Sequence, residues 1–312
     1  MKLEELIARH PRKPAHQVPE WMMGLWRRHI ISFADGSSDV ETQVYWLQSR
    51  NFSVDLRLPR PGDLVTGAAP LRSRTAQELE VLANYEGWVA QSHWDGAQLS
   101  WTEPTTLQFE DRWPEPARLH RVGNCMIEFA PSGAYVEDWR LQLSMPGPLV
   151  GLRLIEEREL PAGRVLHRGG GMIVSGQYAG LVLGRTEEAT DISPLRQQVL
   201  AAQGDQEVLQ RLLGFETSIA HGSLADGFTV THSTKPGRLG AELFPLDGFL
   251  MEADGTVLQE LVSGGQRSLR RFEVDTLESL VEWPLSTPQA PTAAHWMERN
   301  AATLRRYALT RQ

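Results

Sequence analysis

An acidic and a basic residue stand two positions apart in a segment that alternates in polarity. In FSVDLRL (52–58), Asp55 and Arg57 share one side of an extended chain, because successive side chains of a strand point to opposite faces. Four apolar residues share the other side: Phe52, Val54, Leu56 and Leu58. A carboxylate and a guanidinium that face an interior could bind a polar ligand group or assist proton transfer.

Which side of this strand faces an interior decides between two interpretations. If the four apolar residues form the core of the first half, Asp55 and Arg57 belong to an ordinary solvated face. If the charged pair faces a pocket, a helix or the second half of the chain must cover the apolar side. The usual polarity of antiparallel sheets favours the solvated interpretation, and the sequence leaves both open.

Tryptophan is concentrated in the first half of the chain. Eight of the ten tryptophans precede residue 140, and none lies between residues 148 and 274. Such rings fill the core of a small barrel, which is the simpler explanation, or line a pocket for a hydrophobic or amphipathic small molecule, which is the functional hypothesis. The residues predicted to bind this ligand come from strand segments of the first half: Trp46, Gln48, Asp55, Arg57, Trp88, His93, Trp94 and Trp101.

Two other functions compete with ligand binding. A cofactor-free lyase or isomerase could act on a substrate inside a barrel through positioned acid–base groups. The catalytic candidates are four acid–base residues of the first half: His93, Asp55, His120 and Glu128. No catalytic motif accompanies them, so the interpretation leans towards a non-enzymatic binding protein. The third hypothesis is an interaction scaffold that binds a partner protein or forms a homodimer.

The sequence contains little that indicates a phosphate-binding, dinucleotide-binding or metal site. Glycine-rich segments such as RGGGMIVSG (168–176) lack the spacings of a phosphate loop or a dinucleotide fingerprint. The nine histidines form neither HxxxH nor HExxH, and a single cysteine, Cys125, cannot provide several thiolate ligands. We therefore expect no cofactor and no metal site.

Charge and hydropathy bear on the class of partner. The formal net charge is −8, from 31 basic and 39 acidic residues, whereas a nucleic-acid binder usually presents a basic surface. No window approaches the roughly 18 consecutive apolar residues that cross a bilayer. The N-terminal stretch has no apolar segment of signal-peptide length. We expect a cytoplasmic protein with neither nucleic acid nor membrane as its partner.

Several segments recur in the same order in both halves. Each of the segments that begin at residues 24, 43, 87 and 120 has a similar segment 123–129 residues later in the chain. Asp-Gly pairs, typical of tight hairpins, occur in both halves, and helical spacing appears at 75–85, 193–214 and 292–312. Short strands joined by such turns, with one helix in each half, indicate antiparallel sheets and a tandem duplication.

The predicted fold is mainly β: two tandem lipocalin-like antiparallel barrels, with one short helix each and a C-terminal helix. We assign residues 1–19 to an N-terminal arm, 20–145 to the first barrel and 146–275 to the second barrel. Residues 276–312 form a linker and the C-terminal helix.

Four segments carry a resemblance to a known family: WMMGLWRR (21–28), the turn Asp35–Gly36, VYWLQSRNFSVDLRLP (44–59) and GWVAQSHWDG (87–96). Together they resemble the Hri family, in which two lipocalin-like barrels follow one another in a cytoplasmic chain. The resemblance extends over residues 20–275 and lies in architecture more than in a diagnostic motif. It implies the tandem-barrel fold, and it provides no catalytic residues to carry over.

Overall fold

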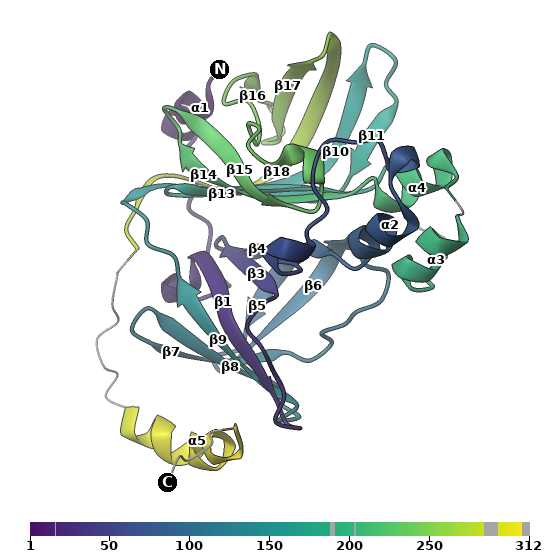
Figure 1. Cartoon of the computed structure of the whole chain (residues 1–312). Coiled ribbons are helices and arrows are strands. Elements are labelled where there is room, and N and C mark those ends of the chain that lie inside the picture. The colour runs from purple at the N-terminus through teal and green to yellow at the C-terminus, as the bar shows by residue number, and fades with distance from the viewer. Residues whose placement is uncertain (16, 188–190, 203, 284–292, 308–312) are drawn as a thin grey trace.

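The computed structural model describes residues 1–15, 17–187, 191–202, 204–283 and 293–307, and it confirms a mainly β fold. Two antiparallel sheets, one from each half, lie one above the other, with helices beside them (Figure 1). The helices are α1 (Leu3–Arg9), α2 (Ala76–Ala83), α3 (Leu195–Ala201), α4 (Gln206–Leu213) and α5 (Ala293–Tyr307).

The first half forms a closed barrel of eight antiparallel strands. Its strands are β1 (Gly24–Phe33), β3 (Gln43–Gln48), β4 (Phe52–Leu58), β5 (Glu86–Trp94), β6 (Gln98–Thr106), β7 (Ala117–Val122), β8 (Cys125–Phe129) and β9 (Tyr135–Leu141). The barrel closes because β1 pairs with both β3 and β9, and the short β2 (Ser38–Asp39) extends beside β1. Closure leaves a lumen into which alternate side chains of each strand point.

The second half is an open sheet, so two tandem lipocalin-like barrels are not confirmed. Its strands are β10 (Gly147–Leu160), β11 (Val165–Arg168), β12 (Gly170–Ser175), β13 (Tyr178–Leu183), β14 (Glu216–Ser223), β15 (Gly227–Ser233), β16 (Phe249–Met251), β17 (Val257–Ser263) and β18 (Gln266–Val281). They follow the order β15-β14-β13-β12-β10-β18-β17-β16, with β11 on β10. The different connectivity of the two sheets also leaves the tandem duplication unconfirmed.

Segments other than strands occupy the two ends of this open sheet. The Val230 amide of β15 donates to the Ala241 carbonyl at 2.9 Å, and the Phe249 amide of β16 donates to the Met1 carbonyl at 3.0 Å. The stretch 1–19, predicted as an arm, contains α1, and this helix buries Leu3 and Leu6 among the core residues of the second half. These segments take the place of a direct β15–β16 pairing.

The helices differ in detail from the sequence expectation. The single helix predicted over 193–214 is two helices, because the Asp205 side chain starts α4 by accepting hydrogen bonds from the Glu207 and Val208 amides at 2.9 and 3.1 Å. Helix α2 begins after Thr75, which forms a capping box with Glu78. Of the predicted linker and C-terminal helix (276–312), residues 284–292 and 308–312 lie outside the described residues.

The apolar side of β4 is covered by the second half. Phe52, Val54, Leu56 and Leu58 are all fully buried, in one cluster with Ile173, Val182 and Ile219 of the second sheet and with apolar residues of α2, α3 and α4. The sheets approach closely where glycine replaces a side chain: a Cβ at Gly180 would lie 2.9 Å from Leu47 Cδ2. This contact turns the opposite side of β4, with Asp55 and Arg57, towards the barrel lumen.

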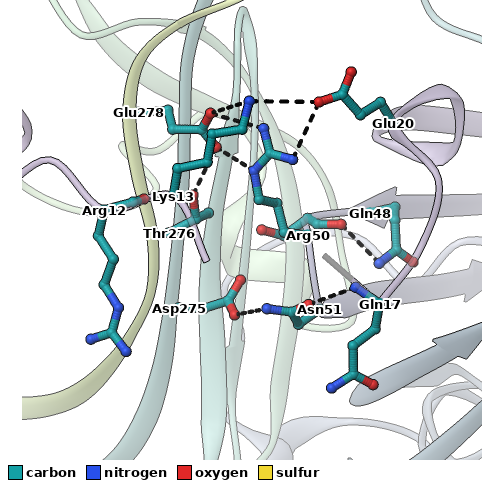
Figure 2. Close-up of polar contacts among 11 residues, drawn as sticks. Arg12, Lys13, Gln17, Glu20, Gln48, Arg50, Asn51, Asp275, Thr276 and Glu278 are labelled. Atoms are coloured by element: carbon teal, nitrogen blue, oxygen red, sulfur yellow. Dashed lines mark hydrogen bonds and ion pairs between the residues drawn. The ribbon is translucent and has the colours of Figure 1, made fainter. Parts of the chain in front are cut away.

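A polar junction holds the turn between β3 and β4 against β18 and the N-terminal stretch (Figure 2). The Arg50 guanidinium forms a bidentate ion pair with Glu278, and its Nη2 donates to Oε2 at 2.8 Å. Beside it, Asn51 Nδ2 donates to Asp275 Oδ1 at 2.6 Å, and the Gln17 amide donates to Asn51 Oδ1. Residues distant in sequence therefore fix the orientation of the two halves.

Candidate functional site

The lumen of the first barrel contains a cavity of about 370 Å³. Strands β3, β4, β5, β6, β7, β8 and β9 contribute to its wall, together with the loop 107–116 between β6 and β7. Five tryptophans line it: Trp46, Trp88, Trp101, Trp113 and Trp139. The size and the mixture of rings with a few polar groups match those of small-molecule pockets, which measure about 300–1,000 Å³.

Five of the eight residues predicted to bind the ligand line this cavity: Trp46, Asp55, Arg57, Trp88 and Trp101. They come together because Trp46, Asp55 and Trp88 are direct cross-strand partners on β3, β4 and β5. Lumen-facing residues at matched positions of neighbouring strands form one row across the inner wall.

The other three predicted residues lie elsewhere. Gln48 is fully buried and accepts a hydrogen bond from Ser92 Oγ at 3.0 Å. Alternation along β5 places His93 on the face opposite Ser92, and its Nε2 pairs with Thr102 Oγ1 at 2.8 Å. Trp94 packs edge-on against Trp21, with 6.1 Å between ring centroids.

The structure also divides the four catalytic candidates. Asp55 and Glu128 line the same cavity, whereas His93 and His120 do not. His120 belongs to β7 and lies beside Trp296 of α5, with 5.2 Å between ring centroids. Burial lowers the pKa of His120 to about 4, so the ring is neutral at physiological pH. Of the four candidates, the structure therefore brings only Asp55 and Glu128 together in this cavity.

Asp55 and Arg57 form a buried ion pair in the lumen. Arg57 Nε donates to Asp55 Oδ1 at 2.9 Å, and the guanidinium carbon lies 4.5 Å from the ring centroid of Trp113. Burial raises the pKa of Asp55, and the adjacent guanidinium counteracts that shift. Burial also acts to lower the pKa of Arg57, but the carboxylates of Asp55, Glu137 and Glu86 outweigh it and raise that pKa. Arg57 is therefore a fixed cation.

A second group of buried charges lies on β1, β8 and β9. Arg28 Nη1 donates to Glu137 Oε1 at 2.8 Å, and Trp139 Nε1 donates to Glu128 Oε2 at 3.0 Å. Burial and the neighbouring Glu137 carboxylate raise the pKa of Glu128 well above its usual range. Glu128 thus keeps its proton at pH values at which an exposed glutamate is ionised.

The loop 107–116 covers the cavity, and both halves hold it. Glu86 accepts hydrogen bonds from Trp113 Nε1 at 3.0 Å and from Arg112 Nη1 at 3.1 Å. From the second half, Arg185 Nη1 donates to the Thr106 carbonyl at 3.0 Å, and its guanidinium lies over the Phe109 ring. Sequence reasoning missed Trp113 and the loop, because an irregular segment has no periodicity that assigns its side chains to an interior. It also missed Glu86, the first residue of β5, although alternation places Glu86 on the same side as Trp88.

Three buried N–H groups of cavity-lining residues lack a protein acceptor within the described chain: Trp46 Nε1, Trp101 Nε1 and Arg57 Nη1. Buried donors are normally paired, because an unpaired one loses its hydration without compensation. All three atoms are also shielded from water, so they lie behind the surface of the cavity.

Comparison with known protein families, with curated proteins and with solved structures finds no match to the chain. The resemblance to the Hri family therefore has no support from relatives. None of the helices in the described part of the chain is long and apolar enough to cross a membrane.

The raised pKa of Glu128 predicts a dependence of stability on pH. Above about pH 4.5 the unfolded chain releases this proton and the folded protein retains it, so wild-type stability falls as pH rises towards the folded pKa. One such proton changes the free energy of unfolding by at most about 1.4 kcal/mol per pH unit. Glu128→Gln is expected to remove this part of the decline, measured by urea unfolding between pH 5 and 8.

Glu41→Gln, a substitution of an exposed residue, serves as the control for this measurement. Its free energy of unfolding is expected to vary with pH in parallel with that of the wild type. Parallel curves for wild type and Glu128→Gln would show instead that Glu128 ionises alike in the folded and unfolded states.

Proposed function

We propose that the first barrel binds a small amphipathic molecule in its lumen. The observation that carries this proposal is the cavity of about 370 Å³, walled by tryptophan rings and containing buried charged groups. A core filled by rings alone would leave no such space. The polar groups of the lumen, Asp55 and Arg57 among them, would orient the ligand, and the rings would provide its apolar contact area.

The second half acts as a scaffold in this proposal. It covers the apolar side of β4, which keeps the charged side in the lumen, and it holds the loop 107–116 through Arg185. A sheet whose outer face is buried is free to present polar groups inwards. We assign no ligand to the second half.

Tryptophan fluorescence provides the test. Titration with a library of hydrophobic, aromatic and acidic metabolites is expected to give a saturable shift with at least one class, because five tryptophans line the cavity. Trp113→Leu removes a ring that lines the cavity and donates a hydrogen bond to Glu86. We expect this variant to bind the ligand about tenfold more weakly, or weaker still. Trp94→Leu is the matched control and is expected to leave the affinity unchanged. A flat response across all classes would refute the proposal.

A cofactor-free isomerase or lyase is the second candidate, favoured by one observation. Asp55 and Glu128 line the same cavity, and only one of them hydrogen-bonds a guanidinium. Two carboxyl groups in different environments can serve as base and acid. Liquid chromatography coupled to mass spectrometry of each library compound after incubation separates the two candidates, because it resolves an isomer of unchanged mass as well as a cleaved product, whereas a binding protein returns its ligand chemically unchanged.

A further inference from the structure

We propose that the cavity of the first barrel binds an organic cation, such as an ammonium compound, in preference to a neutral or anionic molecule of the same shape. The cationic group would contact the aromatic rings of the wall and the Asp55 carboxylate. This inference rests on the proposed function and deepens it by naming the charge class of the ligand.

Acidic residues outnumber basic ones in the cavity wall. The two basic residues are Arg57 and Arg112. Six acidic residues line the cavity: Asp55, Glu86, Glu110, Asp111, Glu115 and Glu128. Glu128 keeps its proton because its pKa is raised, which leaves five carboxylates against two guanidinium groups. The wall therefore has a net negative charge, which attracts cations and repels anions.

Both guanidinium groups already have carboxylate partners. Arg57 Nε donates to Asp55 Oδ1 at 2.9 Å, and Arg112 Nη1 donates to Glu86 Oε1 at 3.1 Å. An anionic ligand would therefore have to compete with these carboxylates for either arginine.

The covering loop contributes carboxylates that accept hydrogen bonds from uncharged donors. The Glu115 carboxylate accepts from the Ser132 amide at 2.8 Å and from the Ser132 hydroxyl at 2.6 Å. These bonds lower the pKa of Glu115, so it is ionised at neutral pH. Asp111 accepts a hydrogen bond from the Trp113 amide at 2.9 Å. Because the donors are uncharged, the negative charge of both side chains remains.

One buried carboxylate oxygen is accessible from the cavity. Asp55 is 2% exposed and lines the cavity. Its Oδ1 accepts from Arg57, whereas no hydrogen bond within the described chain reaches its Oδ2. This oxygen is not among the unpaired atoms that are shielded from water. An ionised carboxylate only accepts hydrogen bonds, and it bonds a cationic donor more strongly than a neutral one.

The rings of the wall add a second kind of attraction for a cation. Seven aromatic residues, five of them tryptophans, line the cavity. The face of an indole ring attracts a cation more strongly than that of any other side-chain ring. The wall already contains one such contact, because the Arg57 guanidinium carbon lies 4.5 Å from the ring centroid of Trp113. Trp88 and Trp101 stand at 73° to each other, so the wall is not one flat plate and can contact a cation from more than one side.

Three benzyl probes that differ in the charge of a tetrahedral head group test this preference on the wild-type protein: benzyltrimethylammonium, benzyl methyl sulfone and phenylmethanesulfonate. By isothermal titration calorimetry, we expect the cation to bind at least about tenfold more tightly than the neutral sulfone, and the sulfonate to bind most weakly. Binding of the sulfone or the sulfonate as tight as that of the cation would overturn the inference.

The same probes distinguish a failure of this inference from a failure of the proposed function. If no probe binds while a compound of the metabolite library does, the charge class is wrong and the proposed function stands. If neither the probes nor the library bind, both fail. Binding of the cation alone supports both, because benzyltrimethylammonium is itself a small amphipathic molecule.

Asp55→Asn tests the interior carboxylate, because it keeps the size of the side chain and removes its charge. We expect cation binding to weaken about tenfold or more, sulfonate binding to strengthen, and sulfone binding to change by less than about twofold. Glu41→Gln is the control: it removes one negative charge from an exposed residue outside the cavity wall, and all three affinities are expected to stay unchanged. Equal losses for cation and sulfone in Asp55→Asn would contradict the inference.

A second variant tests the covering loop and leaves the buried ion pair intact. Glu110→Gln/Asp111→Asn neutralises two exposed carboxylates, and an asparagine oxygen can still accept the hydrogen bond from the Trp113 amide. We expect benzyltrimethylammonium to bind about two- to fourfold more weakly at low ionic strength, with the loss shrinking in about 0.5 M sodium chloride. An unchanged affinity at low ionic strength, or a loss that salt does not reduce, would refute the electrostatic preference even if Asp55→Asn did not fold.

Discussion

Replacing Arg28 with methionine is expected to lower the free energy of unfolding by about 3–5 kcal/mol, the usual cost of removing one partner of a buried ion pair. The Arg28 side chain is 3% exposed, and it contacts Glu137 at 2.8 Å and Asp39 at 3.1 Å. Without it, the Glu137 carboxylate would remain buried beside Glu128, with no cation bonded to it. Urea unfolding at pH 7 measures the change.

Arg140→Met is the matched control, because Arg140 pairs with Asp138 on the same part of the barrel but is 49% exposed. An exposed pair of this kind contributes about 1 kcal/mol or less. The double variant Arg28→Met/Glu137→Gln is expected to recover part of the loss, because the carboxylate then left without Arg28 is that of Asp39, whose side chain is 32% exposed. Similar losses in Arg28→Met and Arg140→Met would contradict the burial argument.

Period-two alternation predicted which residues of β4 share a side of the strand. It did not predict which of the two sides faces the barrel lumen. The sequence placed Asp55 and Arg57 on one side of a strand and four apolar residues on the other. Which side is interior depends on the second half, whose residues Ile173, Val182 and Ile219 cover the apolar side from more than 100 positions away. Local pattern contains no information about that contact.

The histidine candidates show a different limit. His93 was grouped with residues around the pocket, although alternation from Ser92 already places it on the opposite face. His120 packs beside Trp296, a residue of a helix that follows a long connection. Glu128, in contrast, was a candidate only by residue type, and its surroundings became clear only when β8 and β9 brought it beside Glu137 and Trp139.

The second half shows why similar strand patterns do not imply similar closure. Its segments resemble those of the first half in order and spacing, yet the two sheets connect differently. A barrel closes only if its end strands pair, and here β16 instead pairs with Met1 and α1 contributes to the core. The first ten residues contact β16, which lies about 250 positions later in the chain. A comparison of repeated segments does not predict such a contact.

This arrangement makes α1 part of the second half's core. Leu6 is fully buried there, in one cluster with residues such as Phe249 of β16 and Phe272 of β18. Leu6→Ala is therefore expected to lower the free energy of unfolding by about 2–5 kcal/mol, through lost burial and the cavity left behind. Urea unfolding monitored by circular dichroism measures this loss.

Leu250→Ala is the matched control, because Leu250 lies on the neighbouring β16 with half of its side chain exposed. Its truncation removes the same atoms from a site that is only partly buried, so the free energy of unfolding is expected to fall by only about 0.5 kcal/mol. A free N-terminal arm would make Leu6→Ala as harmless as this control. The difference between the two variants therefore measures how far α1 takes the place of the missing strand pairing in the open sheet.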